Sequence, residues 1–157
     1  MAVTTRPIRP SDAETLADLA AALSAHEGAP PPPFDAETVR RWAFGADPRF
    51  SGTLAERNGI AVGYALWHDG FHVGRGAPGL FLMDLFVVPS ARRRGVGSTL
   101  MEAVIDAVRE REGTWMVWQV HPDNREAMAF YRRVGGRRYG AADFEMIIEQ
   151  LDGVDFD

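Results

Sequence analysis

The stretch Val87-Val88-Pro89-Ser90-Ala91-Arg92-Arg93-Arg94-Gly95-Val96-Gly97-Ser98 decides the fold, because it joins an apolar strand to a helix through a glycine-containing turn. The first turn of a helix has unsatisfied N–H donors and the positive end of the helix dipole, and glycine lets a phosphate approach the backbone closely. Three arginines add positive charge. The spacing is neither that of a Walker A loop nor that of a dinucleotide fingerprint. The pattern favours a diphosphate site, with a solvated, arginine-rich turn as the alternative.

Patterns on either side of this turn predict the other elements. Leu80 to Val88 is a strongly apolar run closed by a proline, as expected for a central strand buried on both faces. Asn58-Gly59 suits a type I′ hairpin turn, Ser11 to Glu14 forms a capping box, and Asp35 can cap a helix that ends near Gly45. After a short first strand, the expected strands are residues 53–57, 60–67, 80–88, 115–121, 137–139 and 144–148, with a loop at 69–79 and helices after 11–14, 35, 95 and 123–126.

The order of these elements predicts one α+β domain over residues 1–150, in which helices cover the faces of a sheet. A chain of 157 residues is long enough to bury a core without disulfides. Residues 151–157 form an acidic tail that we expect to be frayed.

Composition excludes several classes of function. The chain has no cysteine, which removes disulfides, thiolate metal sites and cysteine nucleophiles and suits a reducing compartment. Its longest apolar stretch is too short to cross a bilayer, so we expect a cytoplasmic protein without a membrane partner. The four histidines lack ligand spacing, which predicts no metal site. The net charge of −5 argues against a nucleic-acid partner for the arginine cluster.

A second block, Asn124-Arg125-Glu126-Ala127-Met128-Ala129-Phe130-Tyr131-Arg132-Arg133-Val134-Gly135-Gly136, accompanies the turn. The two blocks resemble the GNAT superfamily of acyl-CoA N-acyltransferases, whose motifs are R/Q-x-x-G-x-G/A and N-x-x-A-x-x-F-Y-x-x-x-G. The resemblance covers roughly Arg6 to Ile148 and is greatest for the diamine, polyamine and thialysine branch. It implies a mixed sheet of about seven strands, splayed between strands 4 and 5, with about four helices.

The resemblance also implies a binding site for acetyl-CoA. Pantetheine would pair with the strand edge, and the diphosphate would lie on the turn. The cofactor-binding residues implied in this way are Leu85, Phe86, Val87, Arg92, Arg93, Arg94, Gly95, Val96, Gly97, Ser98, Asn124, Ala127 and Tyr131.

Tyr131 matches the family's general acid, and a phenol with a pKa of about 10 can protonate a thiolate whose thiol has a pKa of about 8.5. The alternative is a core aromatic side chain. For the base, the polyamine-like branch has two acids at the positions of Met83 and Asp84. Asp84 is therefore the candidate on the strand, with Glu27 as a second, and an ion-paired Asp84 and a solvated Glu27 are the alternatives. The substrate-binding candidates are Glu27, Met83 and Asp84.

These residues predict an N-acetyltransferase that transfers acetyl from acetyl-CoA to a primary amine of a small molecule, polyamine-like or amino-acid-like. Direct attack in a ternary complex would need no metal. Because methionine replaces the first acid, a CoA-binding sensor or inactive homologue stays open, as does a peptide or protein N-acetyltransferase. The resemblance also implies a homodimer.

Overall fold

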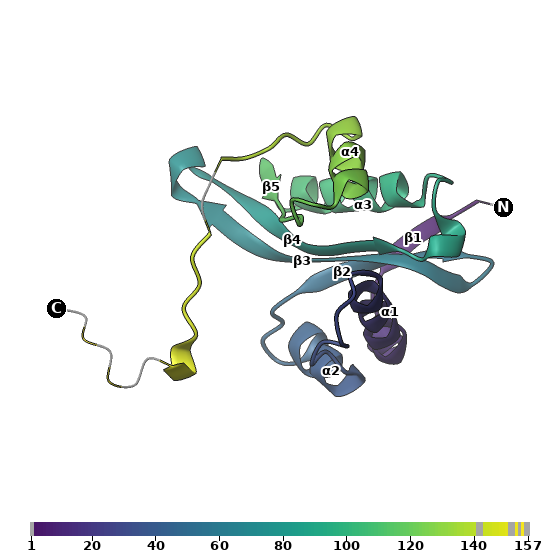
Figure 1. Ribbon diagram of the computed structural model, residues 1–157, viewed down its shortest axis with the longest axis horizontal. Helices are drawn as coiled ribbons and strands as arrows, with labels where there is room; N and C mark the ends of the chain where they lie inside the picture. Colours follow the sequence, from purple (N-terminus) through teal and green to yellow (C-terminus); the bar gives the residue numbers. More distant parts are fainter. Residues whose placement is uncertain (1, 141–142, 151–152, 154, 156–157) are drawn as a thin grey trace. The chain divides into compact units, whose positions relative to one another are not determined.

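The computed structural model describes residues 2–140, 143–150, 153 and 155, and the chain forms two compact units, Met1–Asp123 and Asn124–Asp157. The first unit contains a sheet in the order β1-β2-β3-β4-β5 (Figure 1). Neighbouring strands are antiparallel except β4 and β5, which are parallel. The strands are β1 (Thr4–Pro7), β2 (Ser51–Arg57), β3 (Ile60–His72), β4 (Ala77–Val87) and β5 (Trp115–Val117).

Helices cover both faces of this sheet. In Figure 1, α1 (Ala13–His26) and α2 (Ala36–Phe44) lie on one face and α3 (Val96–Glu110) on the other. The second unit contains α4 (Arg125–Arg133). Short 3₁₀ turns complete the chain: η1 (Pro10–Asp12), η2 (Val73–Arg75), η3 (Pro89–Ala91) and η4 (Ile148–Gln150).

The predicted hairpin turn and second helix cap are confirmed. Asn58 and Gly59 have φ angles of 56° and 74°, as a type I′ turn requires. The Asp35 carboxylate accepts a hydrogen bond from the Thr38 N–H at 2.8 Å, and Gly45 ends α2. Local turn and cap chemistry therefore sets the boundaries of β2, β3 and α2.

The predicted loop over residues 69–79 is wrong. β3 and β4 continue as a paired hairpin to His72 and Ala77, and Gly70 lies opposite Gly79. A Cβ atom at Gly79 would lie 2.2 Å from the Trp115 ring. These two glycines make room for aromatic rings, and the turn itself needs only η2 and Gly76, whose φ is 61°.

The sequence predicted that β4 would be buried on both faces, and this prediction is wrong. Phe81 and Met83 on this strand are 39% and 44% exposed, whereas Leu80, Leu82 and Phe86 are buried. The register with β3 shifts between Leu66 and Trp67, which leaves Met83 as an extra residue in a β-bulge.

The described residues form five strands, not the expected seven. Residues 137–139 and 144–148 are exposed and do not form strands, and Ile148 begins η4. A strand is stabilised by pairing, which its own alternating side chains cannot supply. β5 also ends at Val117 rather than at residue 121. Of the predicted acidic tail, residues 151, 152, 154, 156 and 157 lie outside the described residues, and the single domain over 1–150 stays a prediction.

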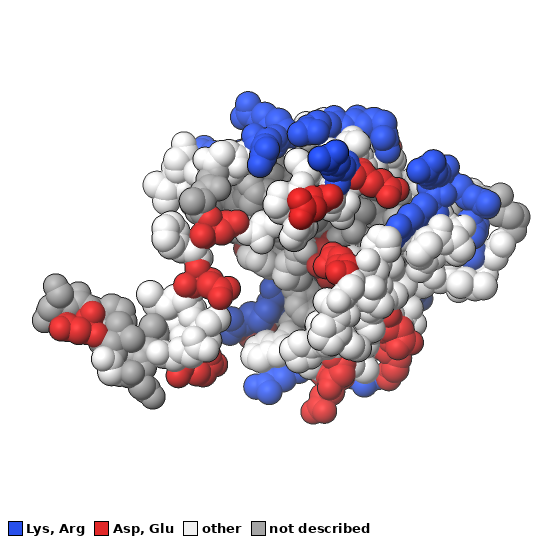
Figure 2. All heavy atoms as spheres, viewed as in Figure 1, with Lys and Arg blue, Asp and Glu red and all other residues white. Residues whose placement is uncertain are grey.

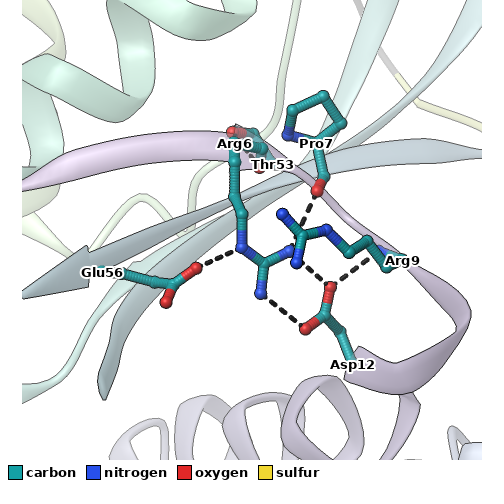
Figure 3. A network of polar contacts seen from close by, with 6 residues as sticks. All are labelled: Arg6, Pro7, Arg9, Asp12, Thr53 and Glu56. Atoms are coloured by element: carbon teal, nitrogen blue, oxygen red, sulfur yellow. Dashed lines mark hydrogen bonds and ion pairs between the residues drawn. The ribbon is translucent and has the colours of Figure 1, made fainter. Parts of the chain in front are cut away.

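The predicted capping box at Ser11 to Glu14 is also wrong. Asp12 precedes α1, and no described side chain caps this helix. Instead the Asp12 carboxylate accepts two hydrogen bonds from the Arg6 guanidinium, each at 2.8 Å, and one from the Arg9 N–H at 2.7 Å (Figure 3). Arg6 also donates to Glu56, so this network joins β1, β2 and the start of α1.

Candidate active site

The turn between β4 and α3 presents backbone N–H groups. Gly95 precedes α3 with a φ of 80°, and Arg93 also has a positive φ, 61°. The N–H groups of the first helical turn have no intrahelical acceptor, and no described side chain caps them, in contrast to α2 and α4. Val96 is buried and anchors the helix. The turn therefore keeps its donors available for an anion.

The three arginines of the turn have different environments. Arg93 and Arg94 are exposed, and Figure 2 shows basic side chains gathered over the connection between β4 and α3. Arg92 is half-buried: its Nε donates to the Val87 carbonyl at 2.9 Å, and its NH1 lies 3.3 Å from Nε2 of His26 at the end of α1. Arg92 thus ties the turn to β4 and α1.

One edge of β4 is not paired with another described strand near this turn. β5 pairs with β4 from Gly79 to Phe81, and the described strands offer this edge no partner beyond that point. The Val88 N–H donates to the Val62 carbonyl of β3, and adjacent residues of a strand direct their backbone groups to opposite edges. The backbone groups of Leu85 and Val87 therefore point away from β3, whereas those of Phe86 point toward it.

Asp84 lies on β4 next to the bulge and is half-buried. The Tyr64 hydroxyl on β3 donates to Oδ2 of Asp84 at 2.9 Å, and Tyr64 is fully buried. Burial raises the pKa of Asp84, which the Tyr64 hydrogen bond opposes. Burial and the Asp84 charge raise the pKa of Tyr64, and the charge of Glu27 adds to this. Glu27 follows α1 and is exposed. Two of the predicted carboxylates therefore act on the same tyrosine, Asp84 through a hydrogen bond and Glu27 through its charge.

The remaining sequence candidates lie in the bulge and in the second unit. Met83 exposes its side chain at the bulge, which gives the site an apolar neighbour where the resemblance implied an acid. In the second unit, Asn124 caps α4 by accepting from the Ala127 N–H at 3.1 Å. Tyr131 is half-buried on α4, with its ring 5.5 Å from that of Phe130.

Sequence reasoning missed Tyr64 and His26. Tyr64 has the pattern of an ordinary strand residue, and its partner Asp84 is 20 positions away. His26 belongs to no motif, so the sequence indicates no role for it. The sequence contained one signal for Tyr64. Asp84 is a charged residue in an apolar strand, and such a residue needs a polar partner.

The described part of the chain contains neither a metal centre nor a membrane-spanning helix. It contains no group of three or more histidine, aspartate or glutamate side chains that could hold a metal ion. Within the same part, no helix combines the length and apolarity that crossing a membrane demands.

Comparisons with known proteins agree with this geometry. The family model described as Acetyltransferase (GNAT) family matches residues 16–136. N-alpha-acetyltransferase 30 of Schizosaccharomyces pombe is 32% identical over 101 residues, which are 64% of this chain and 63% of that protein. The L-2,4-diaminobutyric acid acetyltransferase of Nocardia farcinica is 31% identical over 91 residues, which are 57% of this chain and 46% of that protein. The chain thus spans about half to just under two thirds of the length of these curated relatives.

A solved structure shares the fold. The aminoglycoside N-acetyltransferase AAC(6')-Iy in complex with CoA has a TM-score of 0.76 and 21% identity, and the match covers 93% of this chain and 95% of that one. The GNAT fold that the resemblance implied, with four helices and a mixed sheet, is therefore confirmed, with the strand number corrected above.

Proposed function

Because the chain belongs to the acetyltransferase (GNAT) family, we propose that it transfers an acetyl group from acetyl-CoA to a primary amine of a small molecule. The observation that carries this proposal is the continuity between the freed edge of β4 and the uncapped start of α3. The β4 edge offers backbone groups to an amide-containing arm, and the adjoining N–H donors at the start of α3 suit the diphosphate at the end of that arm.

The turn fits the diphosphate of CoA. A Cβ atom at Gly95 would meet no described atom within 4 Å, so a phosphate can approach the backbone here. The residues that would hold it are Arg93, Arg94, Gly95, Val96, Gly97 and Ser98, with N–H groups and two exposed cations. Arg92 is expected to support the turn from inside, because its guanidinium already binds Val87 and His26.

The β4 edge fits the pantetheine arm. The backbone groups of Leu85 and Val87 point to this edge, although the Val87 carbonyl already accepts from Arg92. Backbone N–H groups at the same edge are suited to stabilise an oxyanion. When bound, acetyl-CoA supplies the thioester whose acetyl group is transferred. We keep Asn124 and Ala127 as proposed contacts on α4.

Two residues are proposed to move protons. A protonated amine must lose a proton before it attacks, and Asp84, whose pKa is raised by burial, is the carboxylate that we propose as the general base. Tyr131 is proposed as the general acid, because it matches the motif position and its phenol can give its proton to the leaving sulfur. Glu27 would attract the cationic amine by its charge.

The substrate class rests on two observations. Glu27 and Asp84 place negative charge near one site, which favours a cationic amine. One relative is named for L-2,4-diaminobutyric acid, an amino acid with an additional amine. Another is named for N-alpha acetylation, so a peptide amine is the second candidate, and a CoA-binding sensor is the third.

Calorimetry with acetyl-CoA and a mass-shift assay test the function together. We expect binding and a gain of one acetyl group, about 42 Da, on diaminobutyric acid, other diamines or polyamines. Acetylation of peptides alone would replace the small-molecule substrate, and binding without transfer to any amine would favour the sensor. The absence of binding at millimolar acetyl-CoA would remove the proposal.

We also propose a homodimer in the cytoplasm. The resemblance supports the dimer, and the absence of cysteine suits a reducing compartment. Light scattering should give twice the 17.3 kDa of one chain, and a mass of one chain at micromolar concentration would contradict the dimer.

A further inference from the structure

Tyr64 lies in the apolar core, and its hydroxyl reaches the half-buried carboxylate of Asp84. Tyr64 is the largest of the fully buried side chains, with 0% of its surface exposed, and its hydroxyl lies 2.9 Å from Oδ2 of Asp84. The Tyr64 ring packs against Phe86, with centroids 6.2 Å apart. Tyr64 on β3 lies opposite Phe86 on β4, and Leu66 on β3 lies opposite Asp84 on β4. The pairing of the two strands therefore holds Tyr64 and Asp84 in place.

The direction of this hydrogen bond is fixed by chemistry. Burial and the neighbouring Asp84 charge raise the pKa of Tyr64, so the phenol keeps its proton. A protonated phenol facing a carboxylate donates, and Oδ2 accepts. The other oxygen, Oδ1, has no hydrogen-bond partner among the described residues. The two oxygens of Asp84 are therefore not equivalent.

We propose that Tyr64 is a positioning residue for Asp84: its hydroxyl holds Oδ2, and the amine proton is received at Oδ1. This inference rests on the proposed function, in which Asp84 is the base. In the step, one N–H bond of the substrate ammonium breaks and an O–H bond forms at Oδ1. The electron pair stays on nitrogen, so an ammonium and a carboxylate become an amine and a carboxylic acid.

The hydroxyl also sets the pH at which Asp84 works. A hydrogen bond to the charged form of a carboxyl lowers its pKa, whereas burial raises it. Other charged groups within residues 2–123 also act near the pair: the charge of Glu27 after α1 raises the pKa of Tyr64, and the Arg92 guanidinium, whose partner is His26, lies 5.7 Å from the Phe86 ring. All of them remain when the hydroxyl alone is removed.

The test compares pH profiles of the wild type and Tyr64→Phe. Loss of a hydrogen bond to a charged group should move the acidic limb of kcat/KM to higher pH by about one unit or more. The same shift should appear without substrate in a ¹³C NMR titration of the Asp84 carboxyl, assigned with Asp84→Asn. An unmoved limb together with an unmoved NMR titration would overturn the inference.

The control is Leu54→Val. Leu54 is buried and lies opposite Tyr64 on β2, so this variant disturbs the same core without touching the hydrogen bond. We expect lower stability and an unchanged acidic limb. A limb that moves as far as in Tyr64→Phe would assign the effect to packing and overturn the inference.

Two further outcomes distinguish a failure of this inference from a failure of the proposed function. If the wild type transfers no acetyl group, the function fails, and the NMR titration still decides the role of Tyr64. If Tyr64→Phe does not fold, the wild type carries the test through the Tyr64 hydroxyl proton. We expect a slowly exchanging downfield proton resonance that is lost in Asp84→Ala, and its persistence in that variant would overturn the inference.

Discussion

Gly95 is the residue on which the geometry of the turn depends. Its φ of 80° is a left-handed conformation that costs other residues about 1–2 kcal/mol. Because a Cβ atom there meets no described atom, Gly95→Ala adds backbone strain without a clash. We expect the dissociation constant for CoA to rise about tenfold, measured by calorimetry. Gly59→Ala is the matched control, with a φ of 74° and the same open space, and equal losses of CoA affinity in both variants would contradict a role for the turn.

Tyr131 is the residue proposed to donate the final proton. Tyr131→Phe removes the acid and keeps the ring, so we expect turnover to fall by about 10²-fold while CoA affinity changes less than about twofold. Steady-state kinetics and calorimetry measure the two effects. Tyr139→Phe, in the same unit, should leave both unchanged. Unaltered turnover of Tyr131→Phe would remove Tyr131 from the mechanism.

Single residues were predictable when a motif or a local turn determined them. Gly95 was predicted to begin a helix and Asp35 to cap one, both from patterns within a few positions, and both predictions are confirmed. Tyr64 could not be predicted, because its role depends on a strand register that brings it to Asp84. The bulge at Met83 is another consequence of register that the sequence did not signal.

At the scale of elements, the connection between β4 and α3 separates two kinds of arginine. Arg94 is exposed, so Arg94→Ala should weaken CoA binding at low salt and have little effect at about 1 M salt, where charges are screened beyond about 3 Å. Arg92→Gln should weaken binding at both salt concentrations, because Arg92 holds the Val87 carbonyl through a direct hydrogen bond. Calorimetry at two salt concentrations measures this, and equal salt dependence would contradict the assignment.

The Arg6 network joins β1, β2 and α1 and makes stability depend on pH (Figure 3). The Arg6 hydrogen bond lowers the pKa of Asp12. A carboxyl with a lowered folded pKa stabilises the protein above its unfolded pKa of about 3.9, and this contribution is lost as pH falls through the folded pKa. Asp12→Asn should cost about 1.5–3 kcal/mol at neutral pH.

Urea unfolding at pH 7 and pH 3 measures this effect, and the gap between Asp12→Asn and the wild type should narrow at the lower pH. Asp18→Asn, at an exposed position of α1, is the control and should change stability little at either pH. A gap that is equal at both pH values would show that the charge of Asp12 is not what stabilises the junction.

Helices and strands were predictable where local sequence patterns determine them. The predictions were wrong where strand pairing determines the structure. The helices and the β2–β3 turn follow from periodicity and turn residues. Residues 69–79 were assigned to a loop because glycine usually marks turns, but Gly70 and Gly79 are small because Phe81 and Trp115 lie against them. Residues 144–148 alternate like a strand but do not form one.

For the whole molecule, the fold class was predictable from the two motifs, because both belong to one family pattern. The position of Asp84 in the fold lowers stability at neutral pH and supplies the proposed base. Burial raises the pKa of Asp84, so its ionised form is disfavoured in the folded protein. Such a group stabilises the protein below its unfolded pKa, and this contribution is lost as pH rises through the folded pKa.

Asp84→Asn should therefore unfold at higher urea concentration than the wild type at pH 7, while below about pH 4 the two should be equal. The amide oxygen can still accept from Tyr64, so the variant removes the charge and keeps the hydrogen bond. Turnover should fall by about 10²-fold or more, because the proposed base is lost. Asp12→Asn gives the opposite dependence on pH, since its carboxyl is stabilised in the charged form. A variant that loses stability at pH 7 would show that the buried charge is not costly, and one that keeps full turnover would show that Asp84 is not the base.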